Sequence, residues 1–235
     1  MNTELRVGIV DSGYRADQAV HVHASAAFVL DDDMQVHRRE AIADRLGHGS
    51  AVVERIAFNA PEARFCVAQV FRERAATTPL QIAEAMRWLV DQGVSLINLS
   101  LGVRADRPAL REACACAVDA GVVVCAASPA QGDPVFPSSY PGVVRVTGDA
   151  RCNSAQWSWL DSAQAEFGAL VRSEGATQAG ASIATAALSG HAAAWLMRHA
   201  EANRDATRGA NRDALLAWLR ANAAFIGVER RTHAS

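Results

Sequence analysis

The sequence predicts an α/β fold in which a mostly parallel central sheet carries helices on both faces. Short apolar runs rich in β-branched residues have the length of buried strands, and stretches with helical periodicity separate them. Strands that alternate with helices of this length form βαβ units, whose crossovers place helices on the two sides of a parallel sheet. With 235 residues, of which 50% are hydrophobic and 20% charged, the chain is long enough to bury such a core.

The predicted strands cover residues 5–10, 64–70, 94–99, 121–126, 143–146 and, after a polar loop, 169–171. The predicted helices cover residues 49–58, 79–92, 107–120, 182–201 and 212–223. In the second helix Leu80, Ala83 and Val90 recur at helical spacing, and Gly93 is placed to end it. Because no repeat or linker divides the chain, we expect a single domain over 1–235, with a flexible tail from about residue 226.

The composition excludes several classes of function. The chain has 23 Lys+Arg against 25 Asp+Glu, a net charge of −2, and it lacks a basic stripe, so nucleic acid is not expected as its principal partner. No apolar run approaches the roughly 20 residues that span a bilayer, and the first residues do not form a signal peptide. The five cysteines are odd in number and lack metal-ligand spacing, which predicts reduced thiols in a cytoplasmic protein.

Polar residues gather where the predicted strands end. Ligands of open α/β sheets bind beyond the carboxyl ends of the strands, where this chain has Asp11–Gly13, Ser100–Gly102 and residues 128–132. His48 lies between two glycines at a predicted helix start, and Ser182 lies at the start of a long Ala-rich helix. Taken singly, the aspartate has an ordinary explanation as a turn residue, the histidine as a loop residue and the serine as a helix-terminal residue.

Taken together and in this order, these segments resemble the motifs of the subtilisin-like serine peptidases (subtilase family, peptidase family S8). Residues 9–13 resemble the aspartate motif, 48–53 the histidine motif, 94–102 the substrate-binding strand and 180–185 the serine motif, and 137–146 match the stretch before it. The chain departs from the family pattern at Ala51, Ala181 and Ala186, where a His, a Thr and a Pro are usual. The resemblance covers nearly the whole chain and implies a three-layer subtilisin-like fold.

The resemblance implies that Asp11, His48 and Ser182 form a catalytic triad. A serine hydroxyl is a poor nucleophile until an imidazole accepts its proton, and the aspartate holds the imidazole tautomer. The resemblance also implies that Ser100, Leu101 and Gly102 pair as an edge strand with an extended peptide or precursor-protein substrate. Together with Ala126, Ala127 and Ser128, this segment is expected to line the pocket for the residue before the scissile bond.

The predicted oxyanion hole departs from the family. The backbone N–H of Ser182 is one expected donor, but Pro129 stands where the family usually has the donor Asn. Proline has neither a side-chain donor nor a backbone N–H. Losing one such donor typically costs about 10²–10³ in turnover. Ser128 and Gln131 are the candidates to replace it in this loop.

The predicted function is an intracellular serine endopeptidase that works through an acyl-enzyme, with activity reduced by the altered hole. The compact chain, for which no N-terminal prodomain is expected, favours processing of a specific precursor peptide. Two alternatives remain open: a catalytically impaired pseudopeptidase that binds peptides, and an enzyme that transfers the acyl group to an amine.

We expect no cofactor. Asp31, Asp32 and Asp33 could form a calcium loop, but three successive carboxylates point in different directions, which favours a solvated turn. His21 and His23 alternate as they would on one side of a strand, yet no third ligand is indicated, so we do not predict a metal site.

Overall fold

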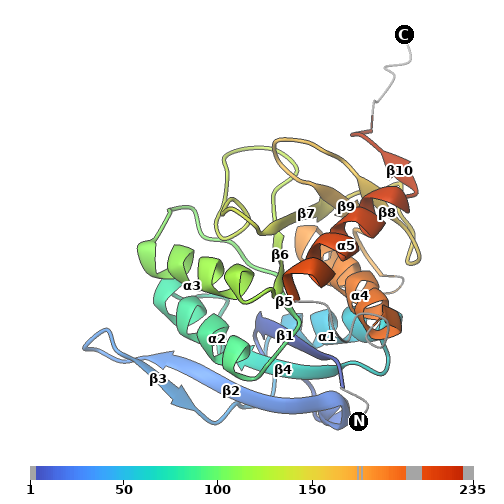
Figure 1. Cartoon of the computed structure of the whole chain (residues 1–235). Helices are drawn as coiled ribbons and strands as arrows, with labels where there is room; N and C mark the ends of the chain where they lie inside the picture. Colours follow the sequence, from blue (N-terminus) through green and yellow to red (C-terminus); the bar gives the residue numbers. More distant parts are fainter. Residues whose placement is uncertain (1–3, 174, 176, 200–207, 230–235) are drawn as a thin grey trace.

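The computed structural model describes residues 4–173, 175, 177–199 and 208–229. These residues form one ten-stranded sheet of order β10-β8-β9-β7-β6-β5-β1-β4-β2-β3, with helices on both faces (Figure 1). The pairs β2–β3 and β8–β9 are antiparallel, whereas the central pairs are parallel. The predicted α/β class is confirmed.

The described elements agree with the main predicted pattern. The strands are β1 Arg6–Asp11, β2 Val22–Leu30, β3 Val36–Arg39, β4 Arg64–Gln69, β5 Leu96–Leu99, β6 Val123–Ala127, β7 Val144–Gly148, β8 Trp157–Trp159, β9 Phe167–Ala169 and β10 Phe225–Ile226. The helices are α1 His48–Asn59, α2 Pro79–Asp91, α3 Pro108–Asp119, α4 Ala181–His199 and α5 Arg208–Ala221, with a 3₁₀ helix η1 Ala16–His21. Each predicted helix is present, although the last two residues predicted for the fourth lie outside the described residues.

The predictions are wrong at the two edges of the sheet. The strand predicted at 169–171 is instead β9, two residues earlier, because Phe167 and Ala169 pair with β7 on one side and β8 on the other. The hairpin β2–β3 and the short strands β8 and β10 were not predicted. His21 ends η1 and β2 begins at Val22, so His21 and His23 do not share one strand.

The C-terminal segment was expected to be flexible from about residue 226, but its first residues are held by the sheet. Ile226 pairs with Trp159 in β10–β8, and the Gly227 N–H donates to the carbonyl of Trp159 at 2.8 Å. The Arg151 side chain donates to the Gly227 carbonyl at 2.7 Å. Residues 230–235 of the predicted tail lie outside the described residues.

Two hydrophobic cores lie on the two faces of the sheet. One contains α1, α4 and α5, and the other contains α2 and α3. Successive side chains of a strand point to opposite faces, so Ile9 of β1 enters the first core and Val10 enters the second. This two-sided burial explains why the central strands have continuous apolar runs instead of alternating ones. No helix among the described residues is long and apolar enough to cross a membrane.

Small residues let α1 and α4 approach each other closely. α4 presents Gly190 to α1, and a Cβ at this position would meet the Ile56 carbonyl oxygen at 3.0 Å. Ala184 and Ala187 of α4 are buried in the same core. Because His48 begins α1 and Ser182 lies in the first turn of α4, this close packing brings the two helix starts to the same edge of the sheet.

A second close approach joins α1 to the loop after β1. A Cβ on Gly49 would overlap the carbonyl oxygen of Gly13 and approach its nitrogen to 2.8 Å. The Gly49 N–H donates to the Ser12 hydroxyl at 2.8 Å across this contact. Only glycine therefore lets α1 begin directly against the end of β1.

We predict that Gly49→Ala lowers the free energy of unfolding by about 1–3 kcal/mol, because the added methyl forces backbone apart in a packed region. Urea denaturation followed by circular dichroism measures the change. Gly209→Ala in α5 is the matched control, since nothing lies within 4 Å of a Cβ there. Equal effects of the two substitutions would contradict the close-approach argument.

Candidate active site

Asp11 and His48 form the most constrained contact of the candidate site. The His48 Nδ1 lies 2.8 Å from Oδ1 and 3.0 Å from Oδ2 of Asp11. The Asp11 side chain is fully buried, whereas that of His48 is 27% exposed. Asp11 Oδ1 also accepts the backbone N–H of Ser12 at 2.7 Å. A buried carboxylate at Nδ1 favours the proton on that nitrogen, which leaves Nε2 as the basic position of the ring.

Asp44, which was not predicted, holds the start of α1 in place. The residue before His48 is Gly47, which has φ of 74° and supplies no capping side chain. Asp44 binds the helix start and the residues before it: Oδ1 accepts from the N–H groups of Leu46 and Gly47, both at 2.9 Å, and Oδ2 accepts from the Ser50 N–H at 2.8 Å and hydroxyl at 2.6 Å. An acidic residue shortly before a glycine and a helix start was the available sequence signal.

Gln69, also not predicted, ties together the loops around Asp11. It ends β4 directly beside Asp11 in the parallel pairing and is fully buried. Its Nε2 donates to the carbonyl of Ser12 at 2.7 Å and to that of Ile42 at 3.0 Å, and its Oε1 accepts the Ile42 N–H at 3.0 Å. A glutamine at the end of an apolar strand was the signal, because a buried amide requires partners.

Ser182 lies in the first turn of α4, where backbone N–H groups lack partners within the helix. Its hydroxyl donates to the Ser100 carbonyl at 2.9 Å, and the Ser100 hydroxyl donates back to the Ser182 carbonyl at 2.9 Å. Asn98 donates to the Ser100 hydroxyl at 2.9 Å and accepts the hydroxyl of Ser189 at 3.0 Å. Because a hydroxyl carries one proton, Ser182 cannot donate to His48 while it donates to the Ser100 carbonyl.

A cavity of about 530 Å³ opens beside His48. Its lining includes Ser100, Leu101 and Gly102, the residues predicted to pair with a substrate. The rest of the lining consists of Leu46, Phe71, Ala75, Ala76, Thr77, Ile82, Val103 and Gln178. Ala126–Ser128, predicted to complete the pocket, are 0%, 8% and 3% exposed and are not among these lining residues.

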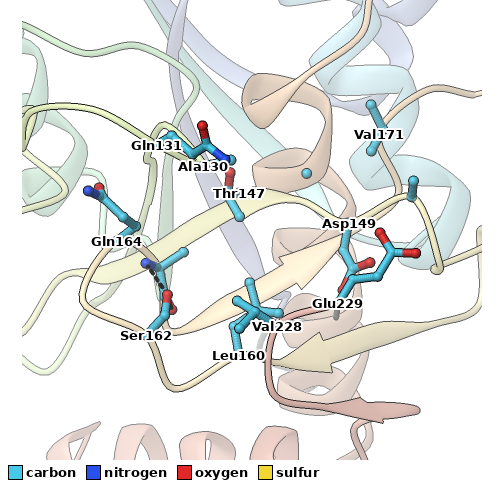
Figure 2. A pocket seen from close by; sticks show the side chains of 13 residues that line it. Ala130, Gln131, Thr147, Asp149, Leu160, Ser162, Gln164, Val171, Val228 and Glu229 are labelled. Carbon is cyan, nitrogen blue, oxygen red and sulfur yellow. Dashed lines mark hydrogen bonds between the residues drawn. The ribbon is translucent and has the colours of Figure 1, made fainter. Parts of the chain in front are cut away.

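The loop after β6 shows how the Pro129 region is held. The Ser128 N–H donates to the Val146 carbonyl at 2.8 Å, and its hydroxyl donates to the Gln164 carbonyl at 2.6 Å. Ser128 therefore has no spare donor in this conformation. Gln131 is exposed and lines a second cavity of about 560 Å³ (Figure 2). Figure 2 places Gln131 and Gln164 on one side of this cavity and Asp149 and Glu229 on the other.

The surroundings shift the pKa values of two partly buried histidines, His48 and His191, in opposite directions. The hydrogen bond from Asp11 raises the pKa of His48 above its usual 6.5 against the opposing effect of burial, and the charges of Asp11 and Asp44 add to the rise. Burial lowers the pKa of His191 to about 4, and the nearby cations Arg55 and Arg198 lower it further. His191 is therefore neutral near pH 7, and no carboxylate of the described residues pairs with it, whereas His48 is suited to hold a proton.

The remaining predicted features have structural roles. Asp31–Asp33 form the turn between β2 and β3, as favoured, and Asp31 accepts the Gln35 N–H at 2.7 Å. The five cysteines are free, and Cys66, Cys114, Cys125 and Cys152 are buried. Burial raises the pKa of the Cys114 and Cys125 thiols to about 12, which makes them unreactive. In the described part of the chain no cluster of three or more His, Cys, Asp or Glu side chains is arranged to hold a metal.

Comparison with known proteins identifies the class. The model of the subtilase family matches residues 2–225, so this chain belongs to the subtilase family of serine peptidases. The major intracellular serine protease of Bacillus subtilis (strain 168) is 29% identical over 162 residues, 60% of this chain and 50% of that protein. Subtilisin DY of Bacillus licheniformis is 28% identical over 171 residues, 66% of this chain and 60% of that protein. The chain thus spans about half the length of these relatives.

Solved structures show the same fold at low sequence identity. The prenylagaramide maturation protease PagA superposes with a TM-score of 0.64 at 19% identity, over 91% of this chain and 82% of that one. A lanthipeptide protease superposes with a TM-score of 0.64 at 18% identity, over 85% of this chain and 75% of that one. The predicted subtilisin-like fold is therefore confirmed.

We predict that His48 titrates above its usual pKa of 6.5 and that Asp11→Asn lowers this value, because the substitution removes the charged acceptor. Since the folded-state pKa is raised, the Asp11 contact stabilises the fold below about pH 6.5, and this contribution is lost as pH rises through the folded-state value. Side-chain NMR of the histidines measures the titration. His191, with a pKa of about 4, is the internal reference. A His48 pKa unaffected by Asp11→Asn would contradict the assignment.

Proposed function

We propose that this chain is a serine endopeptidase that hydrolyses peptide bonds through an acyl-enzyme on Ser182. The observation that carries the proposal is the contact between the buried Asp11 carboxylate and Nδ1 of His48, which prepares Nε2 to accept a proton. Ser182 lies in the first turn of α4 and donates its hydroxyl proton to the Ser100 carbonyl. Ser100 is also part of the lining of the cavity beside His48. Membership of the subtilase family supports these roles.

The reaction begins when the Ser182 hydroxyl turns from Ser100 to His48. His48 removes the proton as Ser182 Oγ attacks the scissile carbonyl, and the imidazolium then protonates the departing amine. Asp11 stabilises the imidazolium without becoming protonated. Water then repeats the sequence on the acyl-enzyme and releases the carboxylic acid, so that both Ser182 and His48 return to their starting states.

Substrate binding supplies a reason for the serine to turn. We infer that an extended peptide pairs with Ser100–Gly102, with its backbone N–H groups directed to the carbonyl groups of this segment. A substrate N–H at the Ser100 carbonyl competes there with the Ser182 hydroxyl, which holds that acceptor at 2.9 Å. Displacement of the hydroxyl would couple peptide binding to activation of the nucleophile.

The oxyanion hole has fewer hydrogen-bond donors than the family pattern supplies, because Pro129 stands where an Asn is usual. The N–H of Ser182 at the start of α4 remains, and the partial positive charge of the helix start adds to it. Pro129 supplies no donor, and both donors of Ser128 are committed to carbonyl groups. We therefore propose slow turnover and a narrow substrate range, such as the processing of one precursor peptide inside the cell.

Two similarities support a processing role within the cell. The solved structures with the same fold include a prenylagaramide maturation protease and a lanthipeptide protease. A relative at 29% identity is an intracellular protease, and the five cysteines of this chain are free thiols. A cleavage profile confined to one class of precursor agrees with this role, whereas broad degradation of unrelated proteins contradicts it.

The alternative function is a pseudopeptidase that binds peptides without turnover. Two observations favour it: Pro129 in place of a donor, and the Ser182 proton directed to Ser100 instead of His48. The cavity beside His48 would then act as a peptide-binding groove.

We predict that a fluorophosphonate probe labels the wild-type protein at Ser182. Ser182→Ala should abolish labelling, and His48→Ala should slow it by about 10³-fold or more, because the hydroxyl loses its general base. In-gel fluorescence and peptide mapping measure both results. Absent labelling of folded wild-type protein would favour the pseudopeptidase.

We also predict that Pro129→Asn raises kcat about tenfold or more with little change in KM, since a donor to the oxyanion acts in the transition state. Pro129→Ala is the matched control, because it relaxes the same backbone position without adding a side-chain donor. Steady-state kinetics on a peptide ester tests both variants. An equal gain in the two would show that backbone freedom, not the donor, limits turnover.

A further inference from the structure

A third cavity, of about 590 Å³, adjoins the candidate triad through α1 and α4. Ile183, the residue after Ser182, forms part of its lining, as do Ala51 and Arg55. Ala51 and Arg55 lie three and seven residues after His48, so they follow it along one face of α1. The lining is completed by Glu54, Phe58, Asn153, Ser154, Leu170, Arg172 and Ser173.

Arg55 is a buried cation without a counterion. The residue is only 4% exposed, and burial lowers its pKa. One guanidinium nitrogen donates to the Ser154 carbonyl at 3.2 Å, and the group lies 4.5 Å from the centre of the Phe58 ring. Its Nε has no hydrogen-bond partner, and no carboxylate of the described residues pairs with it. An unpaired buried charge costs several kcal/mol, so the site has unsatisfied capacity for an anion.

Among the described residues, the other charged groups at this cavity do not supply an anion to Arg55. Arg172 is a second cation in the lining, is exposed, and has no ion pair within the described part of the chain. Glu54 is the acidic residue of the lining, but its carboxylate pairs with Arg15 at 3.2 Å. The polar side chains Asn153 and Ser173 add hydrogen-bonding groups. The cavity therefore combines two cations with no carboxylate bound to either.

The position of the cavity indicates which part of a substrate reaches it. The groove with Ser100–Gly102 and His48 is assigned to the acyl side, whereas this cavity starts at Ile183 and runs down α1 from His48. Seven helical residues rise about 10 Å, and a helical side chain points back toward the helix start. An extended peptide advances about 3.3 Å per residue. Arg55 is thus within reach of the second or third residue after the scissile bond.

We propose that this cavity is a subsite for an acidic side chain of the leaving segment, two or three residues after the scissile bond, with Arg55 and Arg172 as its recognition residues. A carboxylate there accepts from the guanidinium of Arg55, which presents a planar fork of donors and has no carboxylate partner among the described residues. The inference deepens the proposed peptidase function and rests on it. The cavity of Figure 2 carries Asp149 and Glu229, so a leaving segment that ran there would not favour an acidic residue.

The test compares Asp with Asn in a product-like peptide. Four tetrapeptides of Ala carry one Asp at positions one to four, four others carry Asn there, and each is titrated by NMR into Ser182→Ala protein, which cannot turn over. The Asp peptide should bind about tenfold more tightly than its Asn partner at position two or three, the ratio that one charge-assisted hydrogen bond supports. Arg55→Gln and, separately, Arg172→Gln should reduce this ratio toward one.

Two further variants separate recognition from a structural role. Arg55→Lys keeps the charge but loses the fork, so it should retain part of the preference. Arg39→Gln on the edge strand β3, an exposed arginine that is not among the lining residues of this cavity, removes one positive charge and should leave the ratio unchanged. Thermal unfolding of each variant shows whether it is folded, and Arg172→Gln keeps the test valid if Arg55 variants unfold. Equal binding of Asp and Asn peptides at every position would overturn the inference.

A cleavage profile on a proteome-derived peptide library separates this inference from the proposed function. Cleavage with Asp and Glu enriched two or three residues after the cut, and not enriched with Arg172→Gln, agrees with both. Cleavage without that enrichment overturns the subsite and leaves the peptidase intact. No cleavage by folded wild-type protein overturns the peptidase, and the tetrapeptide titration then decides the anion subsite by itself.

Discussion

The hydrogen bond between the buried Asp11 carboxylate and His48 is the interaction on which the candidate site depends. A carboxylate with no exposed surface requires donors, and Asp11 has the Ser12 N–H and the His48 ring. This requirement fixes where α1 can begin. Gly49 must approach Gly13, and any larger residue there would move the histidine away from its partner.

The residues around this bond keep it in place from three directions. Asp44 holds the first turn of α1, Gln69 holds the loop after β1, and the small residues of α4 let that helix pack directly against α1. The serine end of the site is organised differently, because Ser182 and Ser100 each donate a hydroxyl proton to the other residue's backbone carbonyl. The aspartate and histidine are therefore preorganised, whereas the serine hydroxyl must first release the Ser100 carbonyl.

The sequence predicted features that depend on neighbouring residues better than features that depend on the pairing of strands. Asp11, His48 and Ser182 were proposed from the order of their segments along the chain, because each residue taken singly has an ordinary structural explanation. The central strands were predictable because burial on both faces gives them continuous apolar runs. Strand β9 was placed two residues late, since its register is set by β7 and β8 and not by its own residues.

Gln69 and Arg55 were not assigned from the sequence for a related reason. Each is a polar residue whose role comes from a partner distant in the chain or from the lack of one: Gln69 bonds to Ser12 and Ile42, and Arg55 is buried beside Ser154. Local patterns do not contain such contacts. The edge hairpin β2–β3 was missed because its Ala-rich and polar residues lack the apolar run of a central strand.

Intact-protein mass spectrometry after rapid acid quenching of a peptide-ester reaction tests the central claim most directly, because the acid traps any acyl-enzyme before water releases it. The expected result is a mass increase equal to the acyl part of the ester, located by peptide mapping on Ser182. Hydrolysis of the ester with no adduct on Ser182, or with the adduct on another residue, would contradict the central claim.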